Sequence, residues 1–431
     1  MHKQLTLIIG AACLLTATPA EAAVPRGDEP IAVPRAIKQG IDFVYVDPQM
    51  STVARKKQRP QNWLARLFNP AATPRRNQPN PMFLDLARGL QQYQASWGRL
   101  PQVKVPAGSA LKRGATGTRV SALRRRLGLP AAGGYDARVA QLVSAYQQVH
   151  GLGNPDGVAG RATVASLNRS PNYYARRIAI NMERAWRLPT TGTFDRYVVV
   201  DSGAAQTYLF QKDRVVDGMK VIVGAPESKT PMMAVLMRNA KANPYWHVPP
   251  DLVRSLTAKK VKEQGPSYFQ NFHYEVLSDW GPNARPVNPR TVNWKAVASG
   301  RKAPDMLVRQ KPGPWNSMGA MKFEMPNDFG IFLHDTPLKD KFNLTERWIS
   351  NGCVRLQDYR RFASWVFPGG VQASNVPEQR IDLPRPVPIY MTYLTVAPTP
   401  NGVVFRADPY GFDAQAMPQM FGPQMRVASI G

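Results

Sequence analysis

The sequence of 431 residues has only two cysteines, Cys13 and Cys353. Cys13 lies in a stretch typical of a signal peptide, with a basic start, an apolar run over residues 5–15 and small residues just before position 23. Removal of residues 1–22 would leave Cys353 without a disulfide partner. Because exported proteins rarely keep an unpaired cysteine, the sequence favours a reactive thiol at Cys353 over a purely structural one.

Long apolar runs are absent as well. The run over residues 5–15 is far shorter than the ~20 residues that span a bilayer, and no later segment is apolar enough to do so. We therefore expect a cleaved signal peptide over residues 1–22, no transmembrane segment and a mature protein in the periplasm. A lipoprotein signal at Cys13 is disfavoured, because the preceding Gly10-Ala11-Ala12 has no large aliphatic side chain.

Acidic residues are scarce, with 29 against 56 lysines and arginines and a formal net charge of +27. From Pro48 to Tyr135 the only acid is Asp85. This excess predicts an anionic polymer as partner, and peptidoglycan stems and outer-membrane lipids are both acidic. Nucleic acid is the alternative partner of a basic chain, but we expect none because the chain is exported and shows no nucleic-acid-binding fold.

Cys353 follows the turn-forming residues Ser350, Asn351 and Gly352, and His334 ends a short apolar run that predicts a strand. A glycine before the cysteine allows a tight turn whose backbone N–H groups approach a ligand. A single histidine at a strand end is ordinarily structural, and a free cysteine is often an inert core residue. Together they can act as nucleophile and general acid/base in acyl transfer, since an imidazole lowers the pKa of a neighbouring thiol.

The segment Phe332-Leu-His334-Asp-Thr-Pro337 and the later Ser350-x-Gly-Cys-Val-Arg355 resemble the active-site signature of the YkuD-type L,D-transpeptidases. Many members of that family carry a histidine where this chain has Asn351. The chain is similar, more narrowly, to the YcbB-like branch, which often lacks that histidine. The branch is indicated by residues 243–250, 309–316, 322–323, 326–327 and 405–411.

The resemblance, which extends over about residues 172–413, implies an α+β multidomain protein. Its mainly β catalytic domain would occupy residues 196–413, with a capping insertion at about 249–311. Upstream, residues 105–170 resemble a small helical peptidoglycan-binding domain, and the apolar spacing from Val139 to Val149 predicts one of its helices. The remaining parts are expected to be a Pro/Arg-rich N-terminal region and scaffold (23–104), a connecting helix (171–195) and a flexible tail (414–431).

The resemblance implies peptidoglycan biosynthesis, and with it a role in cell-wall biogenesis and cell shape. Cys353 would attack the third residue of a donor stem peptide, His334 would protonate the leaving D-alanine, and an acceptor amine would resolve the thioacyl-enzyme. The N–H groups of Gly352 and Cys353 are candidates for the oxyanion hole. A carbapenem is expected to acylate Cys353, because its strained β-lactam is an acyl donor.

Further residues are candidates for substrate contacts. Arg355 could bind a stem carboxylate bidentately or brace the turn, and the two roles are equally compatible with its position. Ser350 and Asn351 flank the nucleophile, while Tyr245 and Trp315 would either line a substrate groove or serve in packing. Either the Asp335 carboxylate or a backbone carbonyl could orient the imidazole of His334.

No metal and no cofactor are expected. The stretch from Asp156 to Gly160 lacks the repeated carboxylates of a calcium loop. His150 is interpreted as a helix-end histidine favoured by the helix dipole, and His247 as structural.

Two other function classes stay open. A hydrolase, either an L,D-carboxypeptidase or an amidase that releases stems or proteins, would use the same His334 and Cys353 but admit water at the second step. A non-catalytic wall-binding scaffold is disfavoured because both residues are present.

Overall fold

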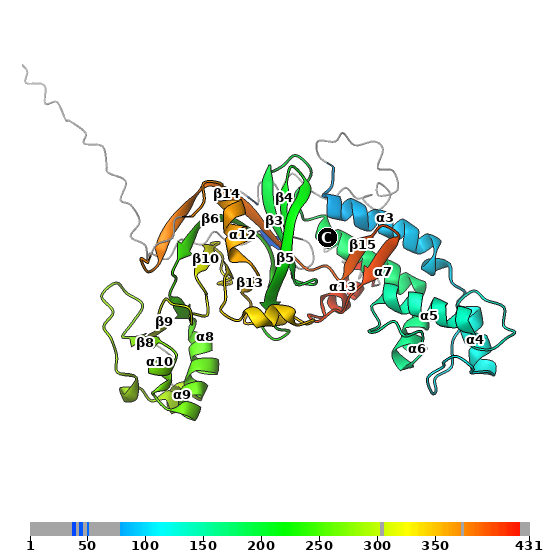
Figure 1. Cartoon of the computed structure of the whole chain (residues 1–431), viewed down its shortest axis with the longest axis horizontal. Coiled ribbons are helices and arrows are strands. Elements are labelled where there is room, and N and C mark those ends of the chain that lie inside the picture. Colours follow the sequence, from blue (N-terminus) through cyan, green and yellow to red (C-terminus); the bar gives the residue numbers. More distant parts are fainter. Residues whose placement is uncertain are drawn as a thin grey trace, which may run out of the picture. The chain divides into compact units, whose positions relative to one another are not determined.

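The computed structural model describes residues 37–39, 43–45, 50, 78–301, 306–371 and 375–422 (Figure 1). The predicted signal peptide and most of the N-terminal region up to residue 77 therefore lie outside the described residues. Within the described ranges, no helix is long and apolar enough to cross a membrane.

The largest sheet of the described residues is mixed and has eleven strands (Figure 1). The strands follow the order β1-β2-β6-β10-β11-β13-β5-β4-β3-β14, and β12 pairs with β5. Because β14 pairs with both β3 and β6, the strands from β6 to β14 close into a ring. Their bounds are Ile37–Gln39 (β1), Phe43–Tyr45 (β2), Arg196–Asp201 (β3), Gln206–Gln211 (β4), Arg214–Gly224 (β5), Met232–Ala242 (β6), Met321–Glu324 (β10), Leu333–His334 (β11), Trp348–Ser350 (β12), Val354–Leu356 (β13) and Gln379–Thr392 (β14).

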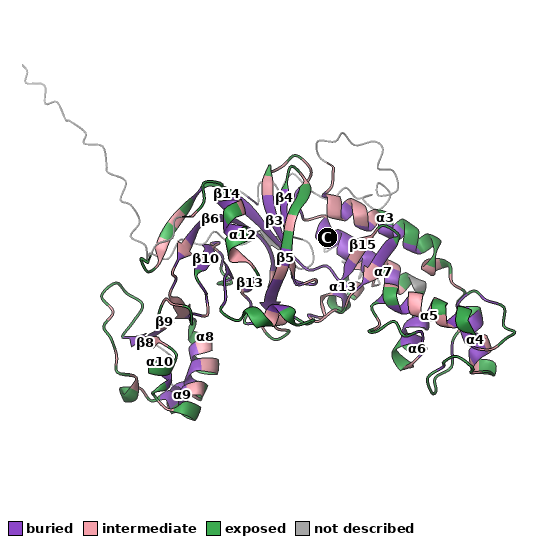
Figure 2. Ribbon diagram, in the orientation of Figure 1, coloured by how far each residue is buried: buried purple, intermediate pink, exposed green. Residues whose placement is uncertain are grey.

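The two faces of the sheet pack against different parts of the molecule. One face packs into an apolar core with α12 (Tyr359–Val366), and most strand residues are buried (Figure 2). Met321, Phe323 and Leu333 belong to this core. Since side chains alternate along a strand, Lys322 and His334 face the opposite side. The active-site candidates therefore lie on the face that α12 does not cover.

Two helices cover the face of the sheet opposite to α12, where they pack on strands that include β3 and β14. They are α3 (Pro81–Ala95) and α7 (Pro171–Ala185), and each begins with a polar N-cap followed by proline at its first position. Their apolar residues, among them Leu86 and Ile178, form a second core with strand residues such as Tyr197. The predicted connecting segment 171–195 thus begins with a helix that packs on the sheet.

Residues 105–170 contain three helices around a core of their own, α4 (Thr118–Arg126), α5 (Ala137–His150) and α6 (Arg161–Leu167). Helix α5 begins at the N-cap Asp136, whose carboxylate accepts from the N–H of Val139, and ends at Gly151 in the left-handed conformation. Val139 and Val143 are fully buried, as their helical spacing predicts.

A small lobe follows β6 and also has its own core, which includes Val248, Val261, Trp294 and Val308. It holds most of the residues predicted as a capping insertion. Its elements are β7 (Trp246–Val248), α8 (Pro250–Leu252), a π-helical turn (Val253–Thr257), α9 (Ala258–Gln264), α10 (Tyr268–Asn271), β8 (Tyr274–Leu277), a 3₁₀ turn (Pro289–Thr291), α11 (Trp294–Ala298) and β9 (Leu307–Gln310).

The expectation of a flexible tail from residue 414 is wrong for its first part. Helix α13 (Phe412–Phe421) occupies this segment. The buried carboxylate of Asp413 accepts from Nε of Arg177 at 2.9 Å and from Nη1 of Arg184 at 2.6 Å. These two buried ion pairs fix α13 to α7, and residues 423–431 lie outside the described ones. The remaining elements are 3₁₀ turns at Trp97–Arg99 and Lys339–Asn343 and the hairpin of β15 (Val396–Thr399) and β16 (Gly402–Phe405).

His150 is the last residue of α5, as the helix-end prediction requires, but it is buried and uncharged, so the helix dipole does not account for its position. Its Nδ1–H donates to the carbonyl of Tyr146 at 2.8 Å, and its Nε2 lies 3.1 Å from the hydroxyl of Tyr93 on α3. Its ring stacks on Tyr146 and on Phe405 of β16. Burial lowers the pKa of His150 to about 4, so the ring is neutral in the folded protein.

This burial predicts acid sensitivity. Between pH 6.5 and 4 the unfolded chain binds a proton at His150 that the folded chain does not, so the free energy of unfolding falls as the pH falls. The loss should be about 2 kcal/mol by pH 5 and about 3 kcal/mol by pH 4. Urea unfolding at several pH values measures it, and His150→Gln should reduce the pH slope by one proton. An unchanged slope in that variant would refute the assignment.

Candidate active site

Cys353 and His334 come together through strand register. β11 and β13 are parallel, with Leu333 opposite Val354 and His334 opposite Arg355. Leu333 and Val354 point into the apolar core. By alternation His334 and Arg355 face the other side, and Cys353, two residues before Arg355, shares that side. The predicted nucleophile and base are thus diagonal neighbours on one face, at adjacent strands.

The turn before the nucleophile depends on glycine and is held by hydrogen bonds. Gly352 has φ +112°, and a Cβ there would lie 3.0 Å from Cδ1 of Ile331. Thr230 Oγ1 donates to the Gly352 carbonyl at 2.7 Å, and Ser350 Oγ donates to the Cys353 carbonyl at 2.6 Å. These bonds fix the backbone on both sides of the thiol.

The structure separates the two oxyanion candidates. The N–H of Gly352 donates to Ser350 Oγ at 3.2 Å, so it is already engaged. The N–H of Cys353 has no acceptor among the described residues. Of the two predicted donors, the one on Cys353 is therefore the free one at this turn.

A backbone carbonyl orients His334. Its Nδ1 lies 2.5 Å from the carbonyl oxygen of Asp335. Since a carbonyl only accepts, Nδ1 carries the proton of the neutral ring and Nε2 is its basic nitrogen. The backbone of Met318 also hydrogen-bonds the ring, and both backbone contacts oppose the fall of the His334 pKa. The Asp335 carboxylate binds Lys339 Nζ at 2.6 Å and the N–H of Ala320 at 2.9 Å instead. This settles the choice between the two orienting groups that the sequence left open.

Both catalytic candidates are neutral at rest. Burial, with the nearby charge of Arg355 as a smaller cause, lowers the pKa of His334 to about 3. Burial also raises the pKa of the Cys353 thiol, and a hydrogen bond with the backbone of Phe332 and the charges of Lys322 and Arg355 oppose this rise more weakly. The expected lowering of the thiol pKa by a neighbouring imidazole is therefore not found in the free protein. Among the described residues no hydrogen bond joins the two side chains, and the thiol of Cys353 lies 3.6 Å from the Gly330 carbonyl.

Positive charge surrounds the pair. Lys322 lies directly opposite His334 across β10 and β11, and its Nζ contacts Glu324 at 2.9 Å. Arg355 forms no ion pair among the described residues, and its buried Nε has no acceptor. Burial lowers the pKa of this guanidinium. Arg355 as a whole is half-buried, and a guanidinium that has no counter-ion in the described residues can bind an anionic ligand.

The other predicted contact residues lie in different surroundings. Ser350 is buried and braces the turn, whereas Asn351 is exposed. The ring of Trp315 is exposed and stacks on His273 with ring centres 3.7 Å apart. Tyr245 lies under the guanidinium of Arg309, 4.0 Å from its centre. No contact joins Tyr245 or Trp315 to the catalytic pair in the part of the chain described.

Tyr410 supports the site and was given no role from the sequence, although it lies in the segment 405–411 that carries the YcbB-like resemblance. Its hydroxyl donates to the Gly224 carbonyl at 2.6 Å and accepts from the N–H of Thr230 at 3.3 Å. Thr230 in turn holds Gly352. A chain of hydrogen bonds therefore runs from Tyr410 to the residue before the nucleophile.

Removing this hydroxyl should loosen the turn. Tyr410→Phe is expected to cost about 1–2 kcal/mol of stability, because the Gly224 carbonyl loses its donor in a buried site. The rate of thiol alkylation at Cys353 should change as well. Tyr135→Phe is a matched control, since its hydroxyl donates to the Gly157 carbonyl at 2.7 Å in the helical module. Equal alkylation rates in both variants would contradict a positioning role for Tyr410.

Comparison with known proteins identifies the catalytic part. Residues 195–383 match the family model of YkuD, the L,D-transpeptidase catalytic domain. A Haemophilus influenzae protein named "Putative L,D-transpeptidase" is 27% identical over 268 residues, which are 59% of this chain and 53% of that protein. The matched part thus spans about half of the length of this curated relative.

Solved structures of similar proteins are more distant. An L,D-transpeptidase from Mycobacterium smegmatis shows 13% identity and a TM-score of 0.23, covering 46% of this chain and 58% of that one. The Ldtfm–avibactam carbamoyl enzyme shows 12% identity and a TM-score of 0.22, covering 46% and 49%. With TM-scores this low, these structures do not establish the fold of this chain. The match to the YkuD family model covers residues 195–383 and therefore includes both His334 and Cys353. The expected α+β fold with a β-rich catalytic part is confirmed, and residues 195–383 form a catalytic domain of the YkuD L,D-transpeptidase family.

Proposed function

We propose that the protein is an exported cysteine L,D-transpeptidase that cross-links peptidoglycan stem peptides through a thioacyl-enzyme on Cys353. One observation carries the proposal: within the YkuD domain, the thiol, the oriented imidazole of His334 and the unpaired guanidinium of Arg355 share one face of the sheet. A nucleophile, a base and an anion-binding group are the parts that acyl transfer from an acidic peptide requires.

The first step begins from the neutral pair. Nε2 of His334 takes the thiol proton as sulfur attacks the carbonyl of the third residue of the donor stem. The N–H of Cys353 is the free donor for the oxyanion. The imidazolium then returns the proton to the amine of the terminal D-alanine, which leaves as the C–N bond breaks. The product is a thioester between the stem and Cys353.

The second step transfers the acyl group. An amine on a neighbouring stem, expected on the side chain of its diamino acid, attacks the thioester while His334 accepts its proton. The tetrahedral intermediate collapses, and the sulfur leaves as the thiol after taking the proton back. Water at the same position would instead give hydrolysis. Arg355, with Lys322 nearby, would hold a carboxylate of the donor stem.

The other parts of the chain fit the same role. We propose that residues 105–170 bind peptidoglycan glycan or stems, that the lobe within 249–311 caps the active site, and that the chain belongs to the YcbB-like branch. We further propose that residues 1–22 are a cleaved signal peptide and that the protein works in the periplasm. The excess of positive charge supports attraction to an acidic wall.

The neutral pair makes a prediction about pH. With the pKa of His334 at about 3 and that of the thiol raised, the acylation rate should stay nearly constant between pH 5 and pH 8. For a histidine with the ordinary pKa of about 6.5, the neutral, basic fraction at pH 5 would instead be about 30-fold smaller than at pH 8. Stopped-flow acylation by a carbapenem measures this rate. A fall of that size at pH 5 in the still-folded protein would argue against the neutral resting state.

Products from natural substrates test the function. The purified protein is incubated with disaccharide-tetrapeptides, and the products are followed by mass spectrometry. Cross-linked dimers support the transpeptidase, free tripeptide product indicates the hydrolase, and unchanged substrate indicates the scaffold. His334→Gln should reduce whichever product forms, which ties the reaction to this site.

A further inference from the structure

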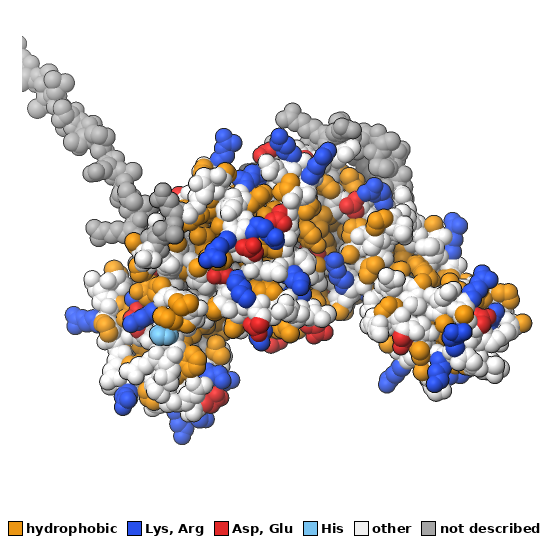
Figure 3. All heavy atoms as spheres, viewed as in Figure 1, with side chains coloured by type: hydrophobic (Ala, Val, Ile, Leu, Met, Phe, Trp, Pro, Cys, Tyr) orange, Lys and Arg blue, Asp and Glu red, His pale blue; other side chains and the backbone are white. Residues whose placement is uncertain are grey.

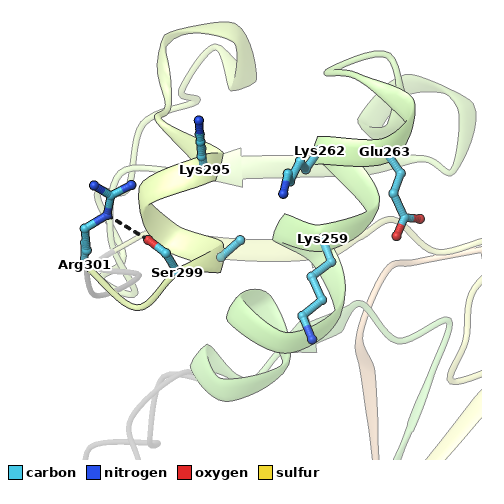
Figure 4. A pocket seen from close by; sticks show the side chains of 7 residues that line it. Lys259, Lys262, Glu263, Lys295, Ser299 and Arg301 are labelled. Atoms are coloured by element: carbon cyan, nitrogen blue, oxygen red, sulfur yellow. Dashed lines mark hydrogen bonds between the residues drawn. The ribbon is translucent and has the colours of Figure 1, made fainter.

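The lobe after β6 carries a positively charged hollow of about 470 Å³. Lysine and arginine side chains project from this lobe (Figure 3). Figure 4 shows Lys259 and Lys262 projecting from α9 and Lys295 from the neighbouring α11, with Glu263 on the side away from Lys295 and Arg301. The lining consists of Lys259, Lys262, Glu263, Lys295, Ala298, Ser299 and Arg301.

The positive charges of the hollow are not neutralised. Within the described residues, Lys259, Lys262, Lys295 and Arg301 form no ion pair. Glu263, the single acid in the lining, lies 3.3 Å from Nζ of Lys260, which is outside the lining. The carboxylate that could offset one lysine of the hollow is therefore shared with another cation.

The lysines of the hollow come from two neighbouring helices, and the ends of Lys259 and Lys295 point in opposite directions (Figure 4). Lys259 and Lys262 are three residues apart on α9, so they occupy the same helix face, and α9 packs against α11, which carries Lys295. Neighbouring like charges on a helix are destabilising. Arg301 is held at the rim because its Nε donates to Ser299 Oγ at 3.0 Å, which leaves its two Nη groups free to bind a ligand.

The chemistry of the lining indicates the type of ligand. Lysine binds phosphate as a point charge, whereas specific carboxylate recognition more often uses the planar fork of arginine. Three lysines, one arginine and a hydroxyl therefore suit phosphate oxygens. The volume lies within the range of small-ligand sites, about 300–1,000 Å³. All four cations of the lining are exposed, so they are accessible to a ligand from solvent.

We propose that this hollow binds a phosphate-bearing ligand with two or more negative charges. The site lies on a lobe with a core of its own and uses none of the groups around Cys353. It therefore holds whether or not the chain is a transpeptidase. The phosphate could belong to a lipid headgroup at a membrane surface or to a soluble phosphorylated sugar.

Binding of inorganic pyrophosphate to the purified protein tests the site by calorimetry. The triple variant Lys259→Gln/Lys262→Gln/Lys295→Gln should bind at least about tenfold more weakly than the unmodified protein. A matched control changes Lys104, Lys112 and Lys212 to glutamine. These lysines are exposed and lie in other parts of the chain. Their substitution removes the same total charge as the triple variant does. The control should bind pyrophosphate normally, and thermal unfolding should show that both variants are folded.

Two further arms identify the source of the phosphate. Binding to cardiolipin vesicles, whose headgroup carries two phosphates, assigns the site to a lipid headgroup if the triple variant loses it and the control keeps it. Pyrophosphate binding with no such vesicle binding assigns it to a soluble phosphate. Equal loss in the triple variant and the control would show a general charge effect and overturn the site, as would the absence of saturable pyrophosphate binding to the unmodified protein.

Discussion

Cys353→Ala should leave the protein unable to gain the mass of a carbapenem, whereas the unmodified protein should gain one equivalent. Cys353 is the single sulfur nucleophile among the described residues, and its turn is held by Ser350, Gly352 and Thr230. The β-lactam ring opens as sulfur attacks its carbonyl, and the ring nitrogen takes the proton from His334. We expect a loss of at least ~10³-fold in acylation rate.

Cys353→Ser provides the graded comparison. A serine hydroxyl fits the same position but is a far weaker nucleophile than a thiol at its ordinary pKa, so slow acylation or none is expected. Both variants should unfold at nearly the same temperature as the unmodified protein, because the thiol makes only a long contact of 3.6 Å to the Gly330 carbonyl. If Cys353→Ala gained the drug's mass at the normal rate, another residue would be the nucleophile.

His334→Gln should slow acylation by about 10²–10⁴-fold, the usual contribution of a positioned general base. Glutamine retains polar atoms but cannot take the thiol proton. The pH profile gives a second readout. Without a base the rate depends on the thiolate that forms spontaneously, so it should rise about tenfold per pH unit below the thiol pKa. The unmodified protein should stay nearly flat over the same range.

Lys322→Gln is a matched control for the charge near the histidine. Lys322 lies opposite His334 in the sheet register but takes no proton in the proposed mechanism. It should keep the flat pH profile even if the rate changes. A His334→Gln variant with a flat profile and a rate within about threefold of normal would show that the imidazole is not the base.

The catalytic pair could be predicted from the sequence because the residues that indicate it lie within a few positions of His334 and of Cys353. The apolar run before His334 predicts a strand, and Gly352 before Cys353 predicts a tight turn. The family signature joins these two segments, and the register of β11 and β13 places both residues on one face. The roles of Ser350 and Gly352 were less accessible, since the N–H of Gly352 is engaged by a side chain within the same turn.

Contacts between distant segments could not be predicted. The brace from Tyr410 to Gly224 joins residues 186 positions apart, and the ion pair of Arg177 with Asp413 joins residues 236 apart. Residues 414–422 appear flexible in sequence because their composition is rich in methionine, glutamine and proline. Asp413 nevertheless fixes the start of α13 to two buried arginines. The neutral state of His334 likewise depends on burial of its ring in the folded protein.

Intact-protein mass spectrometry can detect the thioacyl-enzyme that we propose Cys353 forms with a stem peptide. The purified protein is mixed with a disaccharide-tetrapeptide donor and quenched with acid within seconds. We expect a mass increase equal to the donor minus D-alanine, located on the peptide that contains Cys353 and absent from Cys353→Ala. Donor turnover by the unmodified protein with no such adduct, or an adduct that persists in Cys353→Ala, would contradict the proposal.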